Sequence, residues 1–272
     1  MIDSPIPDAL AAWFREQPFV LTAFSGGVDS SLVAWMANHL LGPDRNLAVI
    51  SASPSLKLSD LDAAKAFAAR HGIPLKIIET RELGNPDYFL NPANRCFFCK
   101  HTLYTELEDL ARRHAPCVIL NGTNTDDLGD YRPGLQAAEH FQVRSPLAEC
   151  GMDKPAVRAL AEALELECWD KPAAPCLSSR IPYGQRVTAT KLRRIEHAET
   201  WLADQGFPVC RVRHIGEAGA RVEVPPEQVA RLQSLESDLA SAFGELGFTK
   251  VELDNEGFVS GKLNRALTSR SG

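Results

Sequence analysis

The stretch Ala23-Phe24-Ser25-Gly26-Gly27-Val28-Asp29-Ser30-Ser31 decides the fold, because it joins a segment typical of a strand to the beginning of a helix. Residues 19–24 predict a short buried strand, and residues 32–41 predict the body of the helix. Two glycines allow a ligand to approach the backbone closely, and a helix N-terminus presents unpaired N–H groups and the positive end of its dipole. The stretch therefore predicts a cradle for an anion such as pyrophosphate.

This loop lacks the phosphate-binding lysine of the GxxxxGKS/T pattern, so it is not a Walker A loop. It resembles instead the SGGxDS loop of the PP-loop ATP pyrophosphatases, which split ATP between its α and β phosphates and attach AMP to a substrate oxygen. For the three residues SGG alone, a glycine turn with a serine helix cap is the simpler alternative. The resemblance implies ATP and Mg²⁺ as cofactors, with Asp29 facing Mg²⁺ and with Ser25, Gly26, Gly27, Asp29, Ser30 and Ser31 binding ATP.

The rest of the first half alternates strands with helices, which predicts an α/β fold with a doubly wound parallel sheet. We expect further strands at 46–51, 75–79 and 117–122, and helices at 6–17, 59–71 (capped by Ser59), 102–114 and 155–164. Ligands of such sheets bind at the carboxyl ends of the strands. The segment after the fourth strand should therefore face the phosphate loop, with Gly122 and Asn124 as candidate ATP ligands and Asp126 and Asp127 as candidate substrate ligands.

A proline-rich connection, Lys171-Pro172-Ala173-Ala174-Pro175-Cys176, predicts a domain boundary. We expect residues 1–170 to form the PP-loop ATP pyrophosphatase domain, of the adenine nucleotide α-hydrolase-like class, and residues 171–272 to form a smaller α+β domain for sulfur transfer and substrate binding. In the second domain we expect helices at 188–205 and 227–246 and strands at 208–214, 220–224 and 250–254.

The composition excludes several classes of protein. A formal net charge of −6 over 272 residues argues against a nucleic-acid coat and against adhesion to a membrane surface. No apolar run is long enough to span a bilayer, and the N-terminus lacks a basic and apolar leader, so we expect a cytoplasmic protein, and a homo-oligomer. The chain has seven cysteines, an odd number, so we do not expect disulfides.

Three of the cysteines are candidates for chemistry. Cys96 and Cys99 form a CxxC, interpreted as a turn, that could bind Zn²⁺, join an iron–sulfur cluster or cycle as a dithiol. Cys176 lies in a polar loop near Arg180, and a nearby cation increases the thiolate fraction of a thiol. It is therefore a candidate nucleophile, metal ligand or sulfur carrier. The other four cysteines, Cys117, Cys150, Cys168 and Cys210, are interpreted as small core residues.

Taken together, the motifs resemble those of the LarE family over nearly the whole chain. They are SGGVDSS, NRCFFCK at 94–100, NGTNTDDLGDYRPG at 121–134, APCLSSRIPYG at 174–184, CRVRH at 210–214 and DNEGFVSGKLN at 254–264. The resemblance implies an ATP-dependent sulfur transferase that helps to build the nickel-pincer nucleotide cofactor of lactate racemase. In that reaction the two carboxylates of a pyridinium mononucleotide are adenylated and converted into thiocarboxylates.

The resemblance also implies roles for single residues. In one branch of the family the Cys176 position gives up its own sulfur and becomes dehydroalanine, and in the other three cysteines hold a [4Fe-4S] cluster that carries sulfide. We favour the cluster, on Cys96, Cys99 and Cys176, because a sacrificial enzyme gives no reason for the CxxC. Arg211 and Arg213, two apart on a strand, are candidates for the substrate phosphate, although a single arginine is often only solvated. The other proposed site residues are Arg180, for the adenylate or a carboxylate, and Ser179, Glu199 and Asp254, near the substrate.

Other functions fit parts of the pattern. A PP-loop tRNA thiolase uses the same adenylation and three cysteines, but it would need an RNA-binding surface, and no basic domain supplies one. An amidating PP-loop enzyme would need an ammonia source for which the chain has no room. A non-catalytic nucleotide-binding regulator offers no role for the CxxC. We therefore expect a small nucleotide substrate and no nucleic-acid or membrane partner.

Overall fold

The chain, a computed structural model, is described for residues 5–129 and 133–258 and separates into two compact units. The first unit contains the described residues up to Glu82 and those from Asn94 to Ala174. The second contains Leu83–Ala93 and the described residues from Pro175 onward. The segment Leu83–Ala93 thus packs with the second unit although it lies far before the proline-rich connection. In the described part of the chain, no helix has the length and apolar character needed to cross a membrane.

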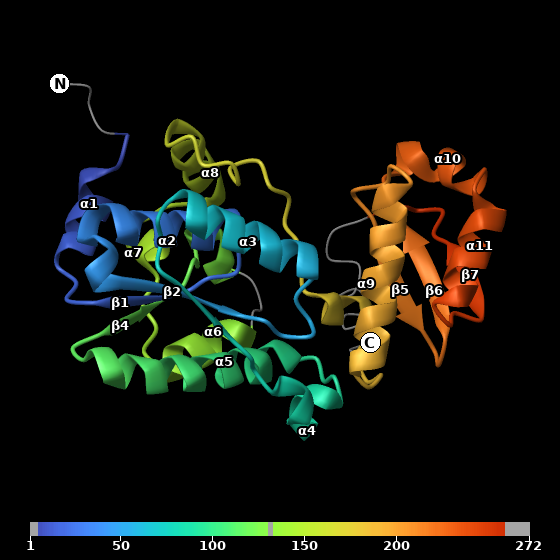
Figure 1. Ribbon diagram of the computed structural model, residues 1–272, viewed down its shortest axis with the longest axis horizontal. Helices are drawn as coiled ribbons and strands as arrows, with labels where there is room; N and C mark the ends of the chain where they lie inside the picture. The colour runs from blue at the N-terminus through green and yellow to red at the C-terminus, as the bar shows by residue number, and fades with distance from the viewer. Residues whose placement is uncertain (1–4, 130–132, 259–272) are drawn as a thin grey trace. The chain divides into compact units, whose positions relative to one another are not determined.

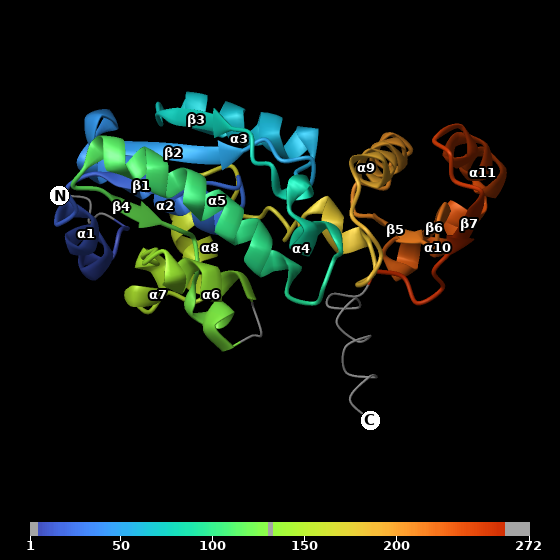
Figure 2. The same cartoon turned by 90° about the horizontal axis from the view of Figure 1, so that it is seen from below.

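A four-stranded parallel sheet forms the centre of the first unit, as predicted. Its strands are β1 (Val20–Ala23), β2 (Asn46–Ser51), β3 (Leu75–Ile78) and β4 (Val118–Leu120), in the spatial order β3-β2-β1-β4 (Figure 2). From β1 the chain adds β2 and then β3 on one side of β1, and it adds β4 on the other side. The switch point of the sheet therefore lies at β1. Loops that follow β1 and β4 therefore diverge at this switch point, where α/β sheets bind their ligands.

Helices cover both faces of this sheet (Figure 1). Alternate strand residues supply the two cores, since Val20 packs on one side and Leu21 on the other. The first core includes α1 (Asp8–Arg15), α2 (Val28–Leu41), α3 (Leu58–Arg70), the short α7 (Pro146–Glu149) and α8 (Lys154–Ala163). The second core includes α5 (Arg95–Ala111) and α6 (Pro133–His140). The doubly wound arrangement is thus confirmed.

Helices α5 and α3 begin at other residues than the sequence predicts. Helix α5 begins at Arg95 rather than at residue 102, so the CxxC lies on a helix and the interpretation as a turn is wrong. Buried Arg95 and the partly buried Phe97, which packs on the second core, explain why these residues join the helix. Helix α3 begins at Leu58 with Lys57 as its N-cap residue, so Ser59 lies inside the first turn and does not cap it.

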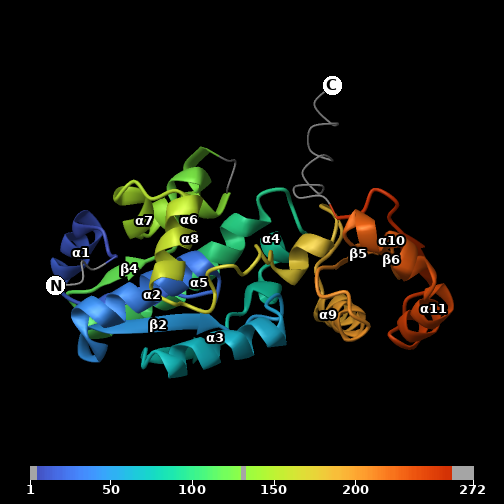
Figure 3. The ribbon, with the colours of Figure 1, turned by 90° about the horizontal axis from the view of Figure 1, so that it is seen from above.

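The second unit has a three-stranded sheet of β5 (Arg211–Ile215), β6 (Gly219–Glu223) and β7 (Lys250–Leu253), with β5 and β6 antiparallel and β6 and β7 parallel. Helices α9 (Ala189–Asp204) and α11 (Glu236–Glu245) lie on the same face of this sheet (Figure 3). The helix predicted at 227–246 is divided into α10 (Val229–Gln233) and α11, because Leu235, with φ of −103°, interrupts it. Leu232 on α10 and Leu239 and Phe243 on α11 are all buried.

The segment Leu83–Ala93, with the short helix α4 (Pro86–Phe89), supports the loop that follows Cys176. Buried Asn91 donates from Nδ2 to the carbonyl oxygens of Ile181, Pro182 and Gln185, at 2.8–3.2 Å. The buried Tyr88 hydroxyl bonds to the Ser178 hydroxyl at 2.5 Å. Since a buried polar group is costly unless it is paired, these contacts fix the backbone of the loop.

Candidate functional site

The phosphate loop lies between β1 and α2, as the sequence predicts. Gly26 has φ of +72°, which only glycine adopts without strain, and a Cβ there would lie 3.0 Å from the Cβ of Ala64. Gly27 is the N-cap residue of α2, and the first backbone bond of the helix is donated by the Ser31 N–H to the Gly27 carbonyl. The N–H groups of the first helical turn have no partner within the helix, so they are available to an anion.

Two serine hydroxyls hold the loop in shape. The Ser30 hydroxyl donates to the Gly27 carbonyl at 3.1 Å and accepts the Ser25 N–H at 3.1 Å. Because the single proton of Ser30 is used in this way, the Ser25 hydroxyl is the donor in the 3.0 Å contact between the two side chains. The loop is therefore preorganised by its own side chains, before any ligand is bound.

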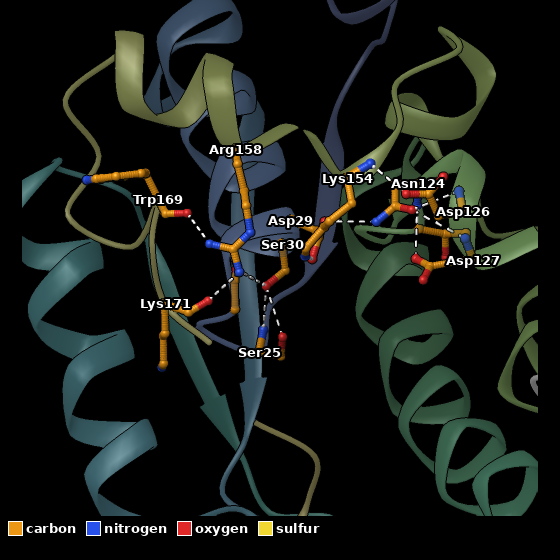
Figure 4. A network of polar contacts seen from close by, with 12 residues as sticks. Ser25, Asp29, Ser30, Asn124, Asp126, Asp127, Lys154, Arg158, Trp169 and Lys171 are labelled. Atoms are coloured by element: carbon orange, nitrogen blue, oxygen red, sulfur yellow. Dashed lines mark hydrogen bonds and ion pairs between the residues drawn. The ribbon is translucent and has the colours of Figure 1, made fainter. Parts of the chain in front are cut away.

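Asp29, in the first turn of α2, has a partner on each carboxylate oxygen (Figure 4). Asn124 donates from Nδ2 to Oδ1 at 3.0 Å, and Lys154 donates from Nζ to Oδ2 at 2.5 Å. Asn124 comes from the loop after β4, and Lys154 from the first turn of α8. Three segments far apart in the sequence therefore meet at the carboxylate that is predicted to face Mg²⁺.

The loop after β4 approaches this turn so closely that only glycine fits at position 122. A Cβ on Gly122 would lie 2.6 Å from the Ser30 nitrogen. Asn124 orders the next turn, since its Oδ1 accepts the N–H of Asp126 at 3.0 Å and Asp127 Oδ2 accepts the N–H of Asn124 at 3.1 Å. The Asp126 carboxylate accepts the backbone N–H of Lys154 at 3.0 Å. Asp127 thus helps to order the loop, and Asp126 joins the loop to the start of α8.

A second lysine, Lys171, contacts the loop from the other side. Its ammonium donates to the Gly26 carbonyl at 3.2 Å and pairs with Asp60 at 3.0 Å. Arg158 holds the Lys171 segment by donating to the carbonyls of Trp169 and Lys171 at 2.5 and 2.7 Å (Figure 4). Behind the loop is a cavity of about 250 Å³. Ser31, only 1 % exposed, lines this cavity with Cys168, whose thiol pKa is raised by burial, so Ser31 lies on the core side of the helix.

The CxxC cysteines lie on the first turns of α5, in the first unit. Cys96 is exposed and Cys99 half-buried, and none of the seven cysteines, all in described segments, forms a disulfide. Residues three apart on a helix lie on the same face, so both thiols point to the same side of α5. Cys176 belongs to the second unit. In the described residues, no three His, Cys, Asp or Glu side chains are grouped to hold a metal ion.

The loop around Cys176 is held by a buried ion pair. Cys176 is exposed and immediately precedes a 3-10 turn, Leu177–Arg180. Arg180, 3 % exposed, binds both oxygens of Glu199 on α9, at 2.9 and 3.2 Å. Its remaining nitrogen donates to the carbonyls of Pro175 and Cys176 and to the Ser179 hydroxyl, at 2.6, 3.3 and 3.0 Å. Arg180 and Glu199 therefore fix the backbone on both sides of the Cys176 side chain.

Arg211 and Arg213 both lie on β5 and are both 8 % exposed, but their surroundings differ. Arg213 binds both oxygens of Glu223 on β6, at 3.0 and 3.1 Å, and donates to the Ser179 carbonyl at 2.9 Å. For Arg211 the contact within the described residues is with the Phe258 ring, 4.2 Å from its guanidinium carbon. Burial, together with the charges of Arg180 and Arg213, lowers the pKa of Arg211 to about 10. An anion at this position would relieve that repulsion.

Asp254 contributes indirectly to this arrangement. Its carboxylate accepts the Glu256 N–H at 3.0 Å, and its carbonyl accepts the Gly257 N–H at 3.1 Å. Gly257 has φ of +74°, and a Cβ there would lie 2.7 Å from the Val224 carbonyl oxygen. This turn brings Phe258 onto Arg211. The rest of the motif that begins at Asp254, from residue 259 onward, lies outside the described residues.

Sequence reasoning missed Lys154, Lys171, Glu223 and Phe258. Lys154 precedes a proline at the start of an otherwise ordinary amphipathic helix, and Glu223 is one of many acidic residues. Neither has a local pattern that indicates a site. Phe258 was part of a quoted motif, and the pairing of Glu223 with Arg213 could have been suspected from two neighbouring strands with opposite charges.

The parallel sheet, the SGGVDSS loop at its switch point and the Asp29 cluster define a PP-loop ATP pyrophosphatase fold and an ATP-using enzyme. The NAD synthase family model matches residues 13–85, which contain this loop. The pyridinium-3,5-bisthiocarboxylic acid mononucleotide synthase of Lactiplantibacillus plantarum is 34 % identical over 259 residues, covering 95 % of this chain and 94 % of that protein. The chain therefore belongs to the LarE family.

Two further relatives match along most of their length. An uncharacterised protein of Synechocystis is 45 % identical over 270 residues, covering 98 % of this chain and 100 % of that protein. An uncharacterised protein of Methanocaldococcus jannaschii is 26 % identical over 237 residues, covering 87 % of this chain and 89 % of that protein. The similarity in all three cases includes the second unit, and not only the ATP-binding half.

Proposed function

We propose that the protein is an ATP-dependent sulfur transferase that converts the carboxylates of pyridinium-3,5-biscarboxylic acid mononucleotide into thiocarboxylates, for the nickel-pincer nucleotide cofactor of lactate racemase. The observation that carries the proposal is the match of 95 % of the chain to a pyridinium-3,5-bisthiocarboxylic acid mononucleotide synthase. That match includes both the phosphate loop and the Cys176 loop, which are the two parts that the reaction needs.

The first step is adenylation. A substrate carboxylate oxygen attacks the α-phosphorus of ATP, the bond to the bridging oxygen breaks, and pyrophosphate leaves with the electron pair of that bond. The N-terminal N–H groups of α2 are suited to hold the phosphates, and the hydroxyls of Ser25 and Ser30 keep the loop in the shape that presents them. The Asp29 carboxylate fits Mg²⁺, which binds to one or two carboxylates together with substrate phosphates and would supply positive charge to the phosphate oxygens.

The second step brings in sulfur. In the simplest form, the Cys176 thiolate attacks the acyl adenylate, AMP leaves, and a thioester forms. Loss of the Cys176 Cα proton then breaks the bond between Cβ and sulfur, which leaves a thiocarboxylate on the substrate and dehydroalanine in the protein. Arg180 and Glu199 act in this account as positioning residues, because their buried pair holds the backbone around an exposed thiol.

We also keep the prediction of a [4Fe-4S] cluster on Cys96, Cys99 and Cys176. The shared face of α5 supports two of these ligands, whereas the described residues contain no grouping of three metal ligands. The third ligand would come from the other compact unit, to which Cys176 belongs. Anaerobic purification followed by iron and sulfide analysis tests it. We expect about four irons per chain, lost in Cys96→Ala, Cys99→Ala and Cys176→Ala alike. An anaerobic sample without iron would leave Cys176 as the sulfur donor.

The substrate phosphate is assigned to Arg211. Arg213 was proposed with it, but the side chain of Arg213 is bidentate with Glu223 and donates to the Ser179 carbonyl, so its charge is already neutralised. Ser179 lies between Arg180 and Arg213, since its hydroxyl accepts from Arg180 and its carbonyl accepts from Arg213. Asp254 supports the Phe258 turn beside Arg211, and Asp126 and Asp127 support the loop beside Asp29, so we assign all three to positioning rather than to direct contact.

The test is pyrophosphate release by the purified protein with ATP and Mg²⁺. We expect release to depend on pyridinium-3,5-biscarboxylic acid mononucleotide and to be accompanied by AMP. Release that depends on tRNA instead would support a tRNA thiolase. Binding of ATP with no release in the presence of either substrate would contradict an enzyme of this class and support a nucleotide-binding regulator.

A further inference from the structure

Arg211 is a buried cation that the charges around it do not fully neutralise. It is 8 % exposed, and the charges of Arg180 and Arg213 repel it. Two nearby carboxylates, Glu199 and Glu223, attract it, but each already binds another arginine through both oxygens. A buried charge is costly unless something compensates it. Arg211 therefore needs another source of stabilisation.

The ring of Phe258 supplies that stabilisation. The Arg211 guanidinium carbon lies over this ring, 4.2 Å from its centre. The face of an aromatic ring carries partial negative charge and attracts a cation. A guanidinium that rests on a ring also keeps its N–H donors, because they lie in the guanidinium plane and point away from its faces. Phe258 therefore holds the charge without using the groups that would bind an anion.

The backbone holds Phe258 in place. Its N–H donates at 2.9 Å to the carbonyl of Val224, the residue after β6. Gly257, with φ of +74°, approaches the same carbonyl so closely that a Cβ on it would lie 2.7 Å from the oxygen. Only glycine adopts this conformation without strain. The turn thus joins Phe258 to the sheet that carries Arg211, and all these residues belong to the second unit.

A second stack in the same unit shows that the ring alone does not make a binding site. Arg231 lies over Phe207, with 4.6 Å between the guanidinium carbon and the ring centre. The Arg231 guanidinium donates to the carbonyls of Gly206 and Gln205, at 3.2 and 2.7 Å, so its donors serve the C-terminal end of α9. Arg211 differs, because its contact within the described residues is with the ring.

We propose that Phe258 is a positioning residue for the substrate phosphate: its ring holds the Arg211 guanidinium against the repulsion of the two neighbouring arginines and leaves its N–H donors to the phosphate. This inference rests on the proposed function, in which that phosphate belongs to a pyridinium mononucleotide. A guanidinium binds two phosphate oxygens at once when its plane is oriented toward them. The stack fixes that plane before the ligand arrives, which lowers the cost of binding.

The test compares two kinds of ligand. Inorganic phosphate is titrated while the arginine Nε–H signals of isotope-labelled protein are followed by nuclear magnetic resonance, in which the ring current of Phe258 marks the Arg211 signal. Pyridinium-3,5-biscarboxylic acid mononucleotide and the corresponding riboside, which lacks the phosphate, are titrated calorimetrically without ATP.

The variants separate the ring from the rest of the side chain. Phe258→Leu removes the ring, and Phe258→Tyr keeps it. The matched control is Phe89→Leu, because Phe89 is likewise half-buried beneath an arginine of the second unit, Arg186. Thermal melting of each variant confirms that it is folded.

We expect Phe258→Leu to bind inorganic phosphate and the mononucleotide about three- to tenfold more weakly, because a cation–π contact is lost. Binding of the riboside should not change. Phe258→Tyr should keep most of the phosphate affinity, and Phe89→Leu should keep all of it. When Arg211→Ala is already present, Phe258→Leu should weaken binding no further, because the ring acts through Arg211.

Unchanged phosphate binding in folded Phe258→Leu, or the same loss with and without Arg211→Ala, would overturn the proposal and leave the ring as packing. An Arg211 signal that does not respond to inorganic phosphate in the wild type would overturn it as well. An Arg211 signal that responds to inorganic phosphate in a protein that does not bind the mononucleotide would support the role of the stack and count against the proposed function.

Discussion

The phosphate loop and the Cys176 loop both gather charged side chains, but they hold them in opposite ways. At the phosphate loop, Asp29 and Lys154 form a single contact with side chains that are 22 % and 31 % exposed. At the Cys176 loop, Arg180 and Glu199 form a bidentate pair with side chains only 4 % and 1 % exposed. The first pair is partly open to water and therefore exchangeable, whereas the second is buried, bidentate and locked. Under the proposed function, the first pair lies beside the loop that would bind ATP, and the second holds the loop that carries Cys176.

The largest expected effect comes from removing the reacting groups themselves. Cys176→Ala should lower thiocarboxylate formation on the order of 10³-fold or more while AMP formation continues, because the alanine can neither attack nor carry sulfur. Asp29→Asn should lower both AMP and thiocarboxylate formation, because it removes the carboxylate assigned to Mg²⁺. Separate chromatographic assays of AMP and of the sulfur product check this. Equal loss of both products in Cys176→Ala would contradict the assignment of separate steps to the two loops.

Next in size is the cost of breaking the locked pair. Glu199→Ala leaves the buried Arg180 charge without its partner and should lower the free energy of unfolding by about 3–5 kcal/mol. Lys154→Met breaks the exposed pair at the other loop and should cost no more than about 1 kcal/mol. Urea denaturation monitored by fluorescence and circular dichroism measures both. Similar losses in the two variants would remove the distinction between an exchangeable and a locked pair.

The two arginines of β5 should differ in the same way, one affecting substrate binding and the other affecting stability. Arg211→Ala should raise the KM for the pyridinium mononucleotide about tenfold or more, because a charge-assisted contact is lost, with little change in stability. Arg213→Ala should lower stability instead, because it leaves buried Glu223 without its bidentate partner. Steady-state kinetics and melting temperatures of the two variants separate these effects. A KM effect confined to Arg213→Ala would reverse the assignment of the phosphate.

The last expected effect is a pH dependence in the second unit, confined to acidic solution. Burial, followed by the charges of Lys191 and Arg194, lowers the pKa of His214 from 6.5 to about 4. The unfolded chain therefore takes up a proton below pH 6.5 that the folded chain does not, and stability falls as the pH drops from 6.5 to 4. His214→Leu should flatten this part of the stability profile by on the order of 2 kcal/mol. Identical profiles for the variant and the wild type would show that His214 does not titrate in this way.

The sequence was sufficient for the parts of the molecule that depend on local patterns. The SGGVDSS loop, the four parallel strands and the position of Asp29 all follow from glycine spacing and apolar runs, and the structure confirms the fold. The start of α5 was mispredicted because the CxxC was interpreted as a turn. Arg95 and Phe97 join the helix because Arg95 is buried and Phe97 packs against the second core of the first unit. That packing is tertiary, and a single sequence does not show it.

The same limit applies to the partners of the charged residues. Lys154 reaches Asp29 only because α8 begins at the switch point of the sheet, and no local pattern records this long-range contact. The sequence prediction likewise gave Arg211 and Arg213 the same role, because residues two apart on a strand lie on the same face. Only the positions of Glu223 and Phe258 distinguish an arginine that is already neutralised from one that is not.

The most direct test of the central claim is a single anaerobic turnover with ATP, Mg²⁺ and pyridinium-3,5-biscarboxylic acid mononucleotide, followed by mass spectrometry of the small molecule and of the intact protein. The account predicts that the mononucleotide exchanges one oxygen for sulfur, with one AMP and one pyrophosphate formed for each exchange, in wild type but not in Cys176→Ala. The mass of the protein then shows whether Cys176 gave up its own sulfur. An unchanged mononucleotide, with no AMP formed, would contradict the account.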